Sequence, residues 1–534
     1  DGSDANTWMI GIEIAASNVT IGNLGVKSFA DWGIRITSGT GTLVKNCEIH
    51  DNGWAEAGGG IHIENCSPDI RKNKIYKNYP AGIFIAGNGA EASPCIKKND
   101  IHDNNIGISV NGIYSSGSAI PDIWNNLIYD TTSSMEYGIQ VSGTTSGTAS
   151  PIIYHNTIDK GLSDGIYLLN VLGTTTPDIK YNIITNFDAY GINNSGGSPT
   201  IEYNDVWNNT GGTCNNCSQG THGISQDPLF SNYELQSGSL CIDAIPTDST
   251  DPVTIDYAGY ARPKNAGFDM GAYEFIADIA HDFSLPGGTG DATDYQMFTV
   301  PVSLESGSSL KQSMESALGT YDKGIWRVFA WDPGSSEYIE MDDPSFADLA
   351  VYPGRGFWVI STSTDTITFS GQPAPDGEYA EVPLFPGWNM VALPWPGTAI
   401  ELDEIAVTDG LNTYFITSTS NTLTQQNVWD YTGEGTDNGY EQRTSGATLQ
   451  PGTAYWIKAL GTAELTMLVP KDNEGGYFTA TSVRAAGRAS KAAEDTEQPP
   501  PPPGLSVSFD STSDGGTRVS GSGGCFIGTV TPME

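Results

Sequence analysis

One eight-residue phrase repeats six times within the first 210 residues. It reads Pro-x-Ile-x-x-Asn-x-Ile/Val, and the first copy runs from Pro68 to Ile75. The later copies begin at Pro94, Pro121, Pro151, Pro177 and Pro199. A second phrase, Gly-Ile-x-aliphatic, falls between them and opens at Gly11, Gly33, Gly60, Gly82, Gly107, Gly138, Gly165 and, more weakly, Gly191. An interval of roughly 22 to 31 residues is typical of stacked structural repeats.

The spacing of apolar residues within one repeat indicates the fold. Apolar residues alternate, as at Ile34/Ile36 and Ile61/Ile63, which predicts short, half-buried strands. No segment between them has the length or the 3.6-residue rhythm of a helix. A single coil of such strands cannot bury its apolar face, whereas stacked coils share one apolar column. We therefore predict an all-β fold in which residues 1–210 form a parallel β-helix.

A polar residue marks the same place in each coil. This place is occupied by Asn73, Asn99, Asn126, Asn156, Asn182 and Asn204. Because an amide side chain both donates and accepts hydrogen bonds, we expect these residues to form a ladder along the stack. Cys47 and Leu24 take the place in the two preceding coils, so the ladder is expected to fade towards the N-terminus.

The repeat resembles the right-handed parallel β-helix repeat proteins of bacteria. That superfamily includes polysaccharide lyases, hydrolases and epimerases, and also surface proteins with no known activity. The resemblance therefore implies the fold and leaves the function open.

Charge and hydropathy narrow the possible partners. The chain of 534 residues holds 63 Asp and Glu against 24 Lys and Arg, a formal net charge of −39. This balance argues against nucleic acid and anionic membranes as partners. No run of about 18 apolar residues could span a membrane. The chain opens at Asp1 without an initiator Met or signal peptide, so we expect a processed, secreted protein of a bacterium, extracellular or on the outer cell surface.

One outward face of the predicted coils carries the candidate site. The position after the inward isoleucine holds His50, Tyr76, His102, Tyr129, Asp159, Thr185 and Trp207. The next position holds Asp51, Lys77, Asp103, Asp130 and Lys160. Rings in a row can stack on sugars, with Tyr76, Tyr129 and Trp207 as glycan-stacking candidates.

Carboxylates beside imidazoles can also perform acid–base chemistry, which makes His50, His102, Asp51 and Asp103 weak catalytic candidates. The alternative is a ladder of like side chains that stabilises one face of a sheet. We favour the ladder, because the acidic clusters of the pectin-cleaving hydrolases are absent from the sequence.

The chain has seven cysteines, an odd number, and Cys47, Cys66 and Cys95 in the coils are expected to be small buried residues. Cys214 and Cys217 form a Cys-x-x-Cys motif with no second pair, which supports zinc only weakly. In a secreted protein we expect a disulfide between them, or from one of them to Cys241.

Residues 211–278 are predicted to close the stack. Their motifs, among them Asp227-Pro-Leu-Phe and Asp269-Met-Gly-Ala-Tyr-Glu-Phe, resemble the C-terminal cap of bacterial surface β-helix proteins that carry varied anchoring signals. A cap is also required physically, since the last coil would otherwise expose an unpaired edge.

A duplication follows in residues 279–375 and 376–470. Trp331-Asp corresponds to Trp429-Asp, and Pro353-Gly…Phe-Trp358 corresponds to Pro451-Gly…Tyr-Trp456. We predict two related β-sandwich-like modules, each with one short helix (309–318 and 401–405), and Trp358 and Trp456 in their cores. The modules resemble domains of secreted bacterial proteins.

Residues 471–534 are predicted to form a low-complexity tail. Five prolines at 499–503 indicate a stiff extended spacer. Gly523-Gly-Cys525-Phe-Ile resembles the box of C-terminal sorting signals in some bacteria, which makes Cys525 an anchoring candidate. Residues 505–509 could add as a strand to an exposed sheet edge, so the chain could associate with itself.

These features favour a non-catalytic extracellular or cell-surface protein with a structural or adhesive role, such as the subunit of a self-assembling fibre or coat. The alternatives are a polysaccharide-active enzyme and a glycan-binding protein, both using the outer face of the β-helix. The expected partners are other copies of the chain or a cell-surface polysaccharide. No cofactor or metal site is predicted, and Ca²⁺ in the Asp/Asn-rich turns stays open.

Overall fold

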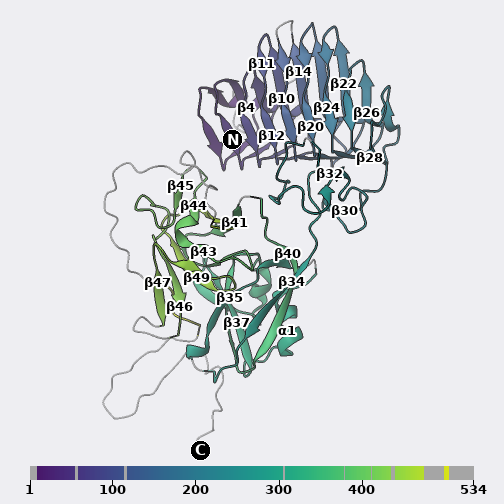
Figure 1. The fold of residues 1–534 in the computed structure, drawn as a ribbon. Coiled ribbons are helices and arrows are strands. Elements are labelled where there is room, and N and C mark those ends of the chain that lie inside the picture. The colour runs from purple at the N-terminus through teal and green to yellow at the C-terminus, as the bar shows by residue number, and fades with distance from the viewer. Residues whose placement is uncertain are drawn as a thin grey trace, which may run out of the picture. The chain divides into compact units, whose positions relative to one another are not determined.

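A computed structural model describes residues 9–473 and 498–503, with short gaps at 55–57, 114–116, 250, 291, 305–306, 378, 411 and 434–438. The chain divides into two compact units, Asp1–Ile276 and Ala277–Glu534 (Figure 1). Cys525 and the predicted strand at 505–509 lie outside the described residues.

The first unit is a stack of parallel coils, as the repeat predicts (Figure 1). Each coil gives one strand to each of three long sheets. The first sheet contains β1 (Ile10–Ala15), β4 (Trp32–Ser38), β7 (Gly59–Glu64), β10 (Ala81–Asn88), β14 (Ile106–Ile113), β18 (Tyr137–Thr144), β22 (Asp164–Val171), β26 (Tyr190–Ser195) and β29 (Gly212–Asn215). The second contains β2 (Thr20–Gly22), β5 (Leu43–Lys45), β8 (Asp69–Arg71), β12 (Cys95–Lys97), β16 (Asp122–Trp124), β20 (Ile152–Tyr154), β24 (Asp178–Lys180) and β27 (Thr200–Glu202).

The third sheet carries the predicted outer column. It contains β3 (Gly25–Lys27), β6 (Glu48–His50), β9 (Lys74–Tyr76), β13 (Asp100–His102), β17 (Leu127–Tyr129), β21 (Thr157–Gly161), β25 (Ile183–Phe187) and β28 (Asp205–Trp207). A short fourth sheet contains β11 (Glu91–Ala92), β15 (Ser118–Ala119), β19 (Thr148–Ala149) and β23 (Thr174–Thr175). All the pairings within these four sheets are parallel, so the predicted parallel β-helix is confirmed.

The two isoleucines of the repeated phrase point into the coil and build the core. Ile96 lies opposite Ile123 of the next coil, and Ile101 lies opposite Ile128. All four side chains are fully buried. Every added coil therefore removes the same apolar surface from water as the one before it.

The glycine of the second phrase is explained by the close approach of neighbouring coils. A Cβ atom on Gly60 would lie 2.5 Å from the carbonyl oxygen of Gly82, and one on Gly138 would lie 2.6 Å from that of Gly165. No side chain fits at these distances, so the glycines stack in a column of bare backbone.

The six asparagines form a ladder inside the stack. Each Nδ2 atom donates to the Oδ1 atom of the next asparagine, at 2.9 to 3.1 Å. At the N-terminal end, the backbone N–H of Cys47 donates to the Oδ1 atom of Asn73. Leu24, one coil earlier, is exposed, so the ladder ends where the sequence loses its asparagine.

A second asparagine ladder was not predicted. Asn52 Nδ2 donates to Asn78 Oδ1, and Asn78 Nδ2 donates to Asn104 Oδ1, both at 3.0 Å. The signal is an asparagine three residues after the inward isoleucine of the third sheet. Thr131 takes this place in the next coil and ends the ladder, and its backbone N–H and hydroxyl donate to Asp103 Oδ1 instead.

The parallel coils continue beyond residue 210. Strand β29 pairs with β26, and isolated parallel bridges join Glu202 to Thr221 and Asp205 to Ile224. The chain then folds back along the side of the stack through β30 (Phe230–Ser231), β31 (Glu234–Leu235), β32 (Ile245–Pro246) and β33 (Gly267–Phe268). We call residues 225–276 the cap segment.

The cap segment covers outward side chains of several coils. Leu235, Ile245 and Phe268 pack with Tyr181 and Ile183 in one apolar cluster. Asn125 Nδ2 donates to the carbonyl oxygen of Ile255, 130 residues away in sequence. The segment therefore seals a side of the rod as well as continuing from its end.

A buried ion pair fastens the cap segment. Arg262 Nη1 lies 2.7 Å from Glu274 Oε1, and both side chains are fully excluded from solvent. The same guanidinium donates to the carbonyl oxygens of Asp269 and Gly271 and to Asn125 Oδ1. These bonds satisfy a charge that would be costly to bury alone.

The second unit holds two antiparallel modules. The first comprises β34 (Ile279–Leu285), η1 (Ala292–Asp294), β35 (Gln296–Thr299), β36 (Val302–Leu304), α1 (Leu310–Leu318), β37 (Trp326–Asp332), β38 (Glu337–Glu340), η2 (Pro344–Asp348), β39 (Gly356–Ser361) and β40 (Asp365–Pro373). The predicted first helix is α1, where the Ser309 hydroxyl caps the backbone N–H of Gln312.

The second module follows the same plan. It comprises β41 (Tyr379–Leu384), β42 (Gly387–Ala392), β43 (Ile400–Glu401), η3 (Leu402–Glu404), β44 (Ala406–Thr408), β45 (Thr413–Phe415), β46 (Val428–Tyr431), β47 (Tyr440–Arg443), β48 (Thr448–Leu449), β49 (Ala454–Ala459) and β50 (Leu465–Pro470). The second predicted helix is only the single 3₁₀ turn η3.

The duplication is visible in the sheets. The order β35-β39-β37-β38 of the first module corresponds to β42-β49-β46-β47 of the second. Trp358 and Trp456 occupy matching strands, and both are fully buried. Residues of both sheets meet in one aromatic cluster, in which Trp331 Nε1 donates to the carbonyl oxygen of Trp388 at 2.8 Å.

Candidate functional site

The outer column of the third sheet is a continuous stack of rings. His50 and Tyr76 lie parallel with centroids 4.7 Å apart, and Tyr76 and His102 lie parallel at 4.9 Å. Tyr129 continues the stack at 5.1 Å from His102. The strand register opposes these residues directly, so the spacing of the coils sets the spacing of the rings.

The faces of the inner rings are therefore occupied by their neighbours. Tyr76 lies between two imidazoles, and His102 lies between two phenols. Tyr233 of the cap segment packs on Tyr129 at the C-terminal end, with centroids 5.0 Å apart. The stack exposes mostly ring edges to solvent. Sugars stack on ring faces, so the inner rings of this column are poorly placed to bind them.

The acidic neighbours lie at the corner after each strand. Asp51 and Asp103 have φ angles of 53° and 55°, and Lys77 has 52° in the same place. In this left-handed conformation the side chain turns back towards the ring before it. His50 Nδ1 lies 2.7 Å from Asp51 Oδ2, and His102 Nδ1 lies 3.0 Å from Asp103 Oδ2.

Asp103 is held as a carboxylate by its surroundings. Its Oδ1 atom accepts from the backbone N–H of Thr131 at 2.6 Å and from the Thr131 hydroxyl at 2.9 Å. Burial alone would raise the pKa of Asp103, but hydrogen bonds from Thr131 and His102 outweigh it and lower the pKa to about 2. A carboxylate fixed in this way is a poor general acid near neutral pH.

Tyr76 is likewise engaged within the column. Its hydroxyl donates to Glu48 Oε1 at 2.7 Å, and burial together with that carboxylate raises the pKa of Tyr76 to about 12. The phenol therefore acts here as a hydrogen-bond donor that remains protonated.

The column changes character towards the C-terminal coils. Asp159, Thr185 and Trp207 follow Tyr129 in strict register. The Thr185 hydroxyl donates to Asp159 Oδ1 at 2.8 Å, while Trp207 is half-buried at the end of the row. Trp207 is therefore separated from the ring stack by two polar positions.

A second outward row was missed in the sequence. The variable position of the Gly-Ile-x-aliphatic phrase faces out from the first sheet and places Arg35, His62 and Phe84 side by side. The His62 ring stacks on Trp32, with centroids 4.7 Å apart. Burial lowers the pKa of His62 to about 4, with Glu64 opposing and Arg35 adding to the effect. The imidazole is therefore neutral at pH 7.

Two exposed aromatic residues lie on neighbouring loops. Trp54 is 63% exposed and Tyr79 is 54% exposed. The Tyr79 N–H donates to the carbonyl oxygen of Asn52, so the loops that carry these rings run beside each other. Unlike the stacked column, rings this exposed can offer a face to a ligand.

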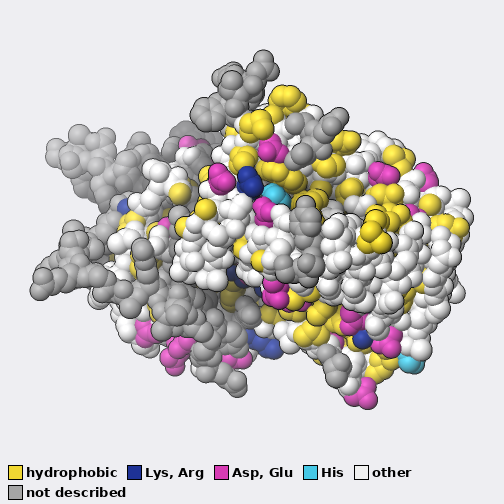
Figure 2. All heavy atoms as spheres, turned by 90° about the horizontal axis from the view of Figure 1, so that it is seen from above, with side chains coloured by type: hydrophobic (Ala, Val, Ile, Leu, Met, Phe, Trp, Pro, Cys, Tyr) yellow, Lys and Arg dark blue, Asp and Glu magenta, His cyan; other side chains and the backbone are white. Residues whose placement is uncertain are grey.

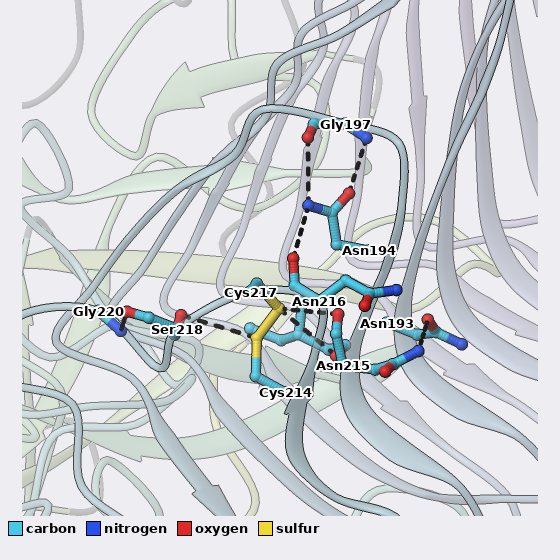
Figure 3. Close-up of a disulfide and its surroundings, with 10 residues drawn as sticks. Asn193, Asn194, Gly197, Cys214, Asn215, Asn216, Cys217, Ser218 and Gly220 are labelled. Atoms are coloured by element: carbon cyan, nitrogen blue, oxygen red, sulfur yellow. Dashed lines mark hydrogen bonds between the residues drawn. A yellow bond between two sulfur atoms is a disulfide. The ribbon is translucent and has the colours of Figure 1, made fainter.

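Cys214 and Cys217 form a disulfide within one turn, with their Cα atoms 5.5 Å apart (Figure 3). Asn193, Asn194, Asn215 and Asn216 surround it in Figure 3, and Asn215 Nδ2 donates to Asn193 Oδ1 at 3.0 Å. The disulfide closes the last turn of the first sheet. The alternative pairing with Cys241 is not formed, because Cys241 is a buried free thiol that donates to Asp205 Oδ2.

On the face drawn in Figure 2, charged side chains do not gather in one patch. The face in Figure 2 shows acidic side chains scattered among apolar and polar ones, with few basic groups. Within the described ranges, no three His, Cys, Asp or Glu side chains gather closely enough to hold a metal ion. In the same part of the chain, no helix is long and apolar enough to cross a membrane.

Comparison with known proteins agrees with the first unit. Residues 5–148 and 59–227 match the sequence profile described as "Right handed beta helix region". Together with the observed coils, the match makes this part of the chain a right-handed parallel β-helix repeat region.

No curated protein sequence matches the chain. Among solved structures, the crystal structure of the Dettilon tailspike protein is similar at 12% identity, with a TM-score of 0.20, over 86% of this chain and 87% of that one. We draw no conclusion about this chain from a likeness of that size.

Proposed function

We propose that this chain is a non-catalytic extracellular or cell-surface protein of a bacterium, with a structural or adhesive role. The proposal rests on the contacts that the side chains of the outer column make with one another. Its rings stack on one another, and the Asp103 carboxylate is fixed by Thr131 and His102. Side chains that satisfy one another in this way stabilise a sheet face and are poorly placed to turn over a substrate.

The direct test is electron microscopy of the natively secreted protein. Regular filaments with a repeat of one subunit length would support a fibre or coat subunit. Material that stays dispersed as single particles at every concentration, and that neither binds cells nor a surface polysaccharide, would overturn the structural and adhesive role.

The enzymatic alternative has its own discriminating experiment. Depolymerisation of a polysaccharide panel by wild type, but not by His50→Ala/His102→Ala, would assign catalysis to the column and contradict the proposal. His62→Ala serves as a matched control, because it removes an imidazole of the coils that lies on the first sheet, outside the column.

Glycan binding is a second candidate, favoured by the exposed rings of Trp54 and Tyr79. Two aromatic side chains on adjacent loops provide a platform of the kind that sugars stack on. If this candidate holds, Trp54→Ala/Tyr79→Ala abolishes glycan-array binding, while Tyr76→Ala and Tyr129→Ala retain it. Equal binding by all of these variants would reject the platform.

Anchoring through Cys525 and calcium binding by the turns remain proposals. Mass spectrometry of native material would show a cleaved or modified C-terminus if Cys525 is an anchor. An unchanged melting temperature in EDTA would argue against structural Ca²⁺.

A further inference from the structure

Two tyrosines from different modules converge on the proline tract. Tyr338 belongs to β38 and Tyr440 to β47, the edge strands of the two corresponding sheets. The Tyr440 hydroxyl donates to the carbonyl oxygen of Pro500 at 2.6 Å, and the Tyr338 hydroxyl donates to the same oxygen at 3.4 Å. A carbonyl oxygen has two lone pairs, so it can accept both bonds.

Most of the proline tract is turned towards the protein. Pro499, Pro502 and Pro503 are buried, Pro500 is partly buried and Pro501 is exposed. Successive prolines fix φ and keep the preceding residue extended, which generates a helix of three residues per turn. Residues 499 and 502 therefore lie on one face, and that face is turned towards the protein.

The hydrogen-bonding chemistry of the two partners is complementary. A proline tract has no N–H groups and presents only acceptors. Trp358 Nε1 donates to the Tyr338 oxygen at 3.2 Å, which leaves the Tyr338 hydrogen to point elsewhere. Burial raises the pKa of both Tyr338 and Tyr440 well above the usual value, so both phenols remain donors. Aromatic surfaces with outward donors are the usual receptors for polyproline II segments.

We propose that Tyr338 and Tyr440 form a binding site for a proline-rich segment in the polyproline II conformation, and that residues 499–503 of the same chain occupy it. The bound tract contacts the edge strands of both modules and so links the two modules to each other. Because the tract belongs to the same chain, its binding is intramolecular and a separate peptide must compete with it.

The test uses the full chain with residues 499–503 replaced by an equal number of Gly and Ser residues. A fluorescent peptide with the sequence of residues 498–504 is titrated by anisotropy into this variant and into wild type. Saturable binding to the variant, and binding at least tenfold weaker to wild type, is expected because wild type holds its own tract. Equal binding to both proteins, or binding no tighter than that of a Gly/Ser peptide, would overturn the proposal.

Substitutions separate recognition from folding. In the replaced chain, Tyr338→Phe/Tyr440→Phe keeps both rings and removes both donors, so the peptide affinity should fall roughly tenfold. In the otherwise native chain, Pro499→Ser/Pro502→Ser should open the site to the peptide, whereas Pro501→Ser, on the exposed side, should leave it closed. A site equally open in these two variants would contradict docking through the buried face. Unchanged circular dichroism spectra would confirm that each variant is folded.

Discussion

The Nδ2 atom of Asn99 donates a hydrogen bond to the Oδ1 atom of Asn126 across two neighbouring coils at 3.0 Å, and neither side chain reaches solvent. Asn126 also donates to the carbonyl oxygen of Ile96 and accepts from the backbone N–H of Asn99. One amide therefore satisfies buried polar groups in the coil before it, and Asn156 Oδ1 extends the chain of bonds into the coil after it.

Asn126→Ala should lower the free energy of unfolding of the β-helix by about 2 to 5 kcal/mol. The substitution strands several buried donors and acceptors, and each one left without a partner costs about 1 to 3 kcal/mol. Denaturant titration followed by hydrogen exchange in the coils measures the loss. Asn88→Ala is the matched control, since that side chain donates to Glu64 Oε1 at 2.8 Å in an exposed place and should cost little. Equal losses in the two variants would mean that the ladder contributes no special stability.

Gly138→Ala should disrupt the stack far more than Gly25→Ala. At Gly138 an added Cβ would lie 2.5 Å from the Ile158 side chain and 2.6 Å from the carbonyl oxygen of Gly165, so two coils would have to separate. At Gly25 nothing lies within 4 Å of the added atom. We expect a loss above about 2 kcal/mol for the first and a change within about 0.5 kcal/mol for the second. Thermal unfolding of both variants tests the column, and a mild effect at Gly138 would refute it.

Arg262→Met should destabilise the cap segment by about 3 to 5 kcal/mol, because it leaves the Glu274 carboxylate buried without its cation. Arg262→Met/Glu274→Gln should recover part of that loss, which a double-mutant cycle would detect. The partly exposed pair Lys180–Glu202, at 3.2 Å, provides the comparison, and Lys180→Met should cost less than about 1 kcal/mol. A loss at Arg262 no larger than that at Lys180 would contradict the assigned role.

Asp205 should contribute a loss of stability as the pH rises from about 4 to about 7, while His62, whose pKa is lowered to about 4, contributes in the opposite direction. Burial raises the pKa of Asp205 from 3.8 to about 7, against opposing hydrogen bonds from Gln226 and Cys241. The folded chain then holds this proton to a higher pH than the unfolded chain does. Its contribution is complete below about pH 4 and is lost through about pH 7, roughly 4 kcal/mol in all.

Asp205→Asn should remove this contribution, so the unfolding free energy of the variant should fall less, or rise more, than that of wild type as the pH rises, because an amide does not titrate. Asp188→Asn, at an exposed position, should leave the slope as it is in wild type. Urea titrations at several pH values between 4 and 7 compare the three proteins. An unchanged slope in Asp205→Asn would remove this carboxyl as a source of the effect.

The periodic features of the sequence predicted the fold of the first unit because each coil meets its neighbours in the same way. Ile96, Asn99 and Ile101 recur at one interval, and their contacts recur with them. The cap segment was harder to foresee, because the bond from Asn125 to Ile255 joins residues with no shared spacing.

The candidate sites also differ in how far the sequence predicts them: features that repeat from coil to coil are predictable, and single contacts are not. The register of the outer column was predictable, whereas the mutual stacking of its rings required knowledge of their orientation. The second asparagine ladder is short and ends where Thr131 replaces the asparagine, so its period is weak in the sequence. The contact between Tyr440 and Pro500 has no sequence signal beyond the two residue types.

The path of the cap segment limits how the rod can change in length. Its hydrogen bonds reach Asn125, His155 and Tyr181, so the number of coils on that side must match the length of the returning chain. A coil inserted near Asn73 would instead contact a coil on each side with the same isoleucines and asparagine at the same places, so its own contacts would match those of the existing coils. Insertion or deletion of whole coils is therefore expected near the N-terminal end of the rod. The cap segment fixes the number of coils at the C-terminal end.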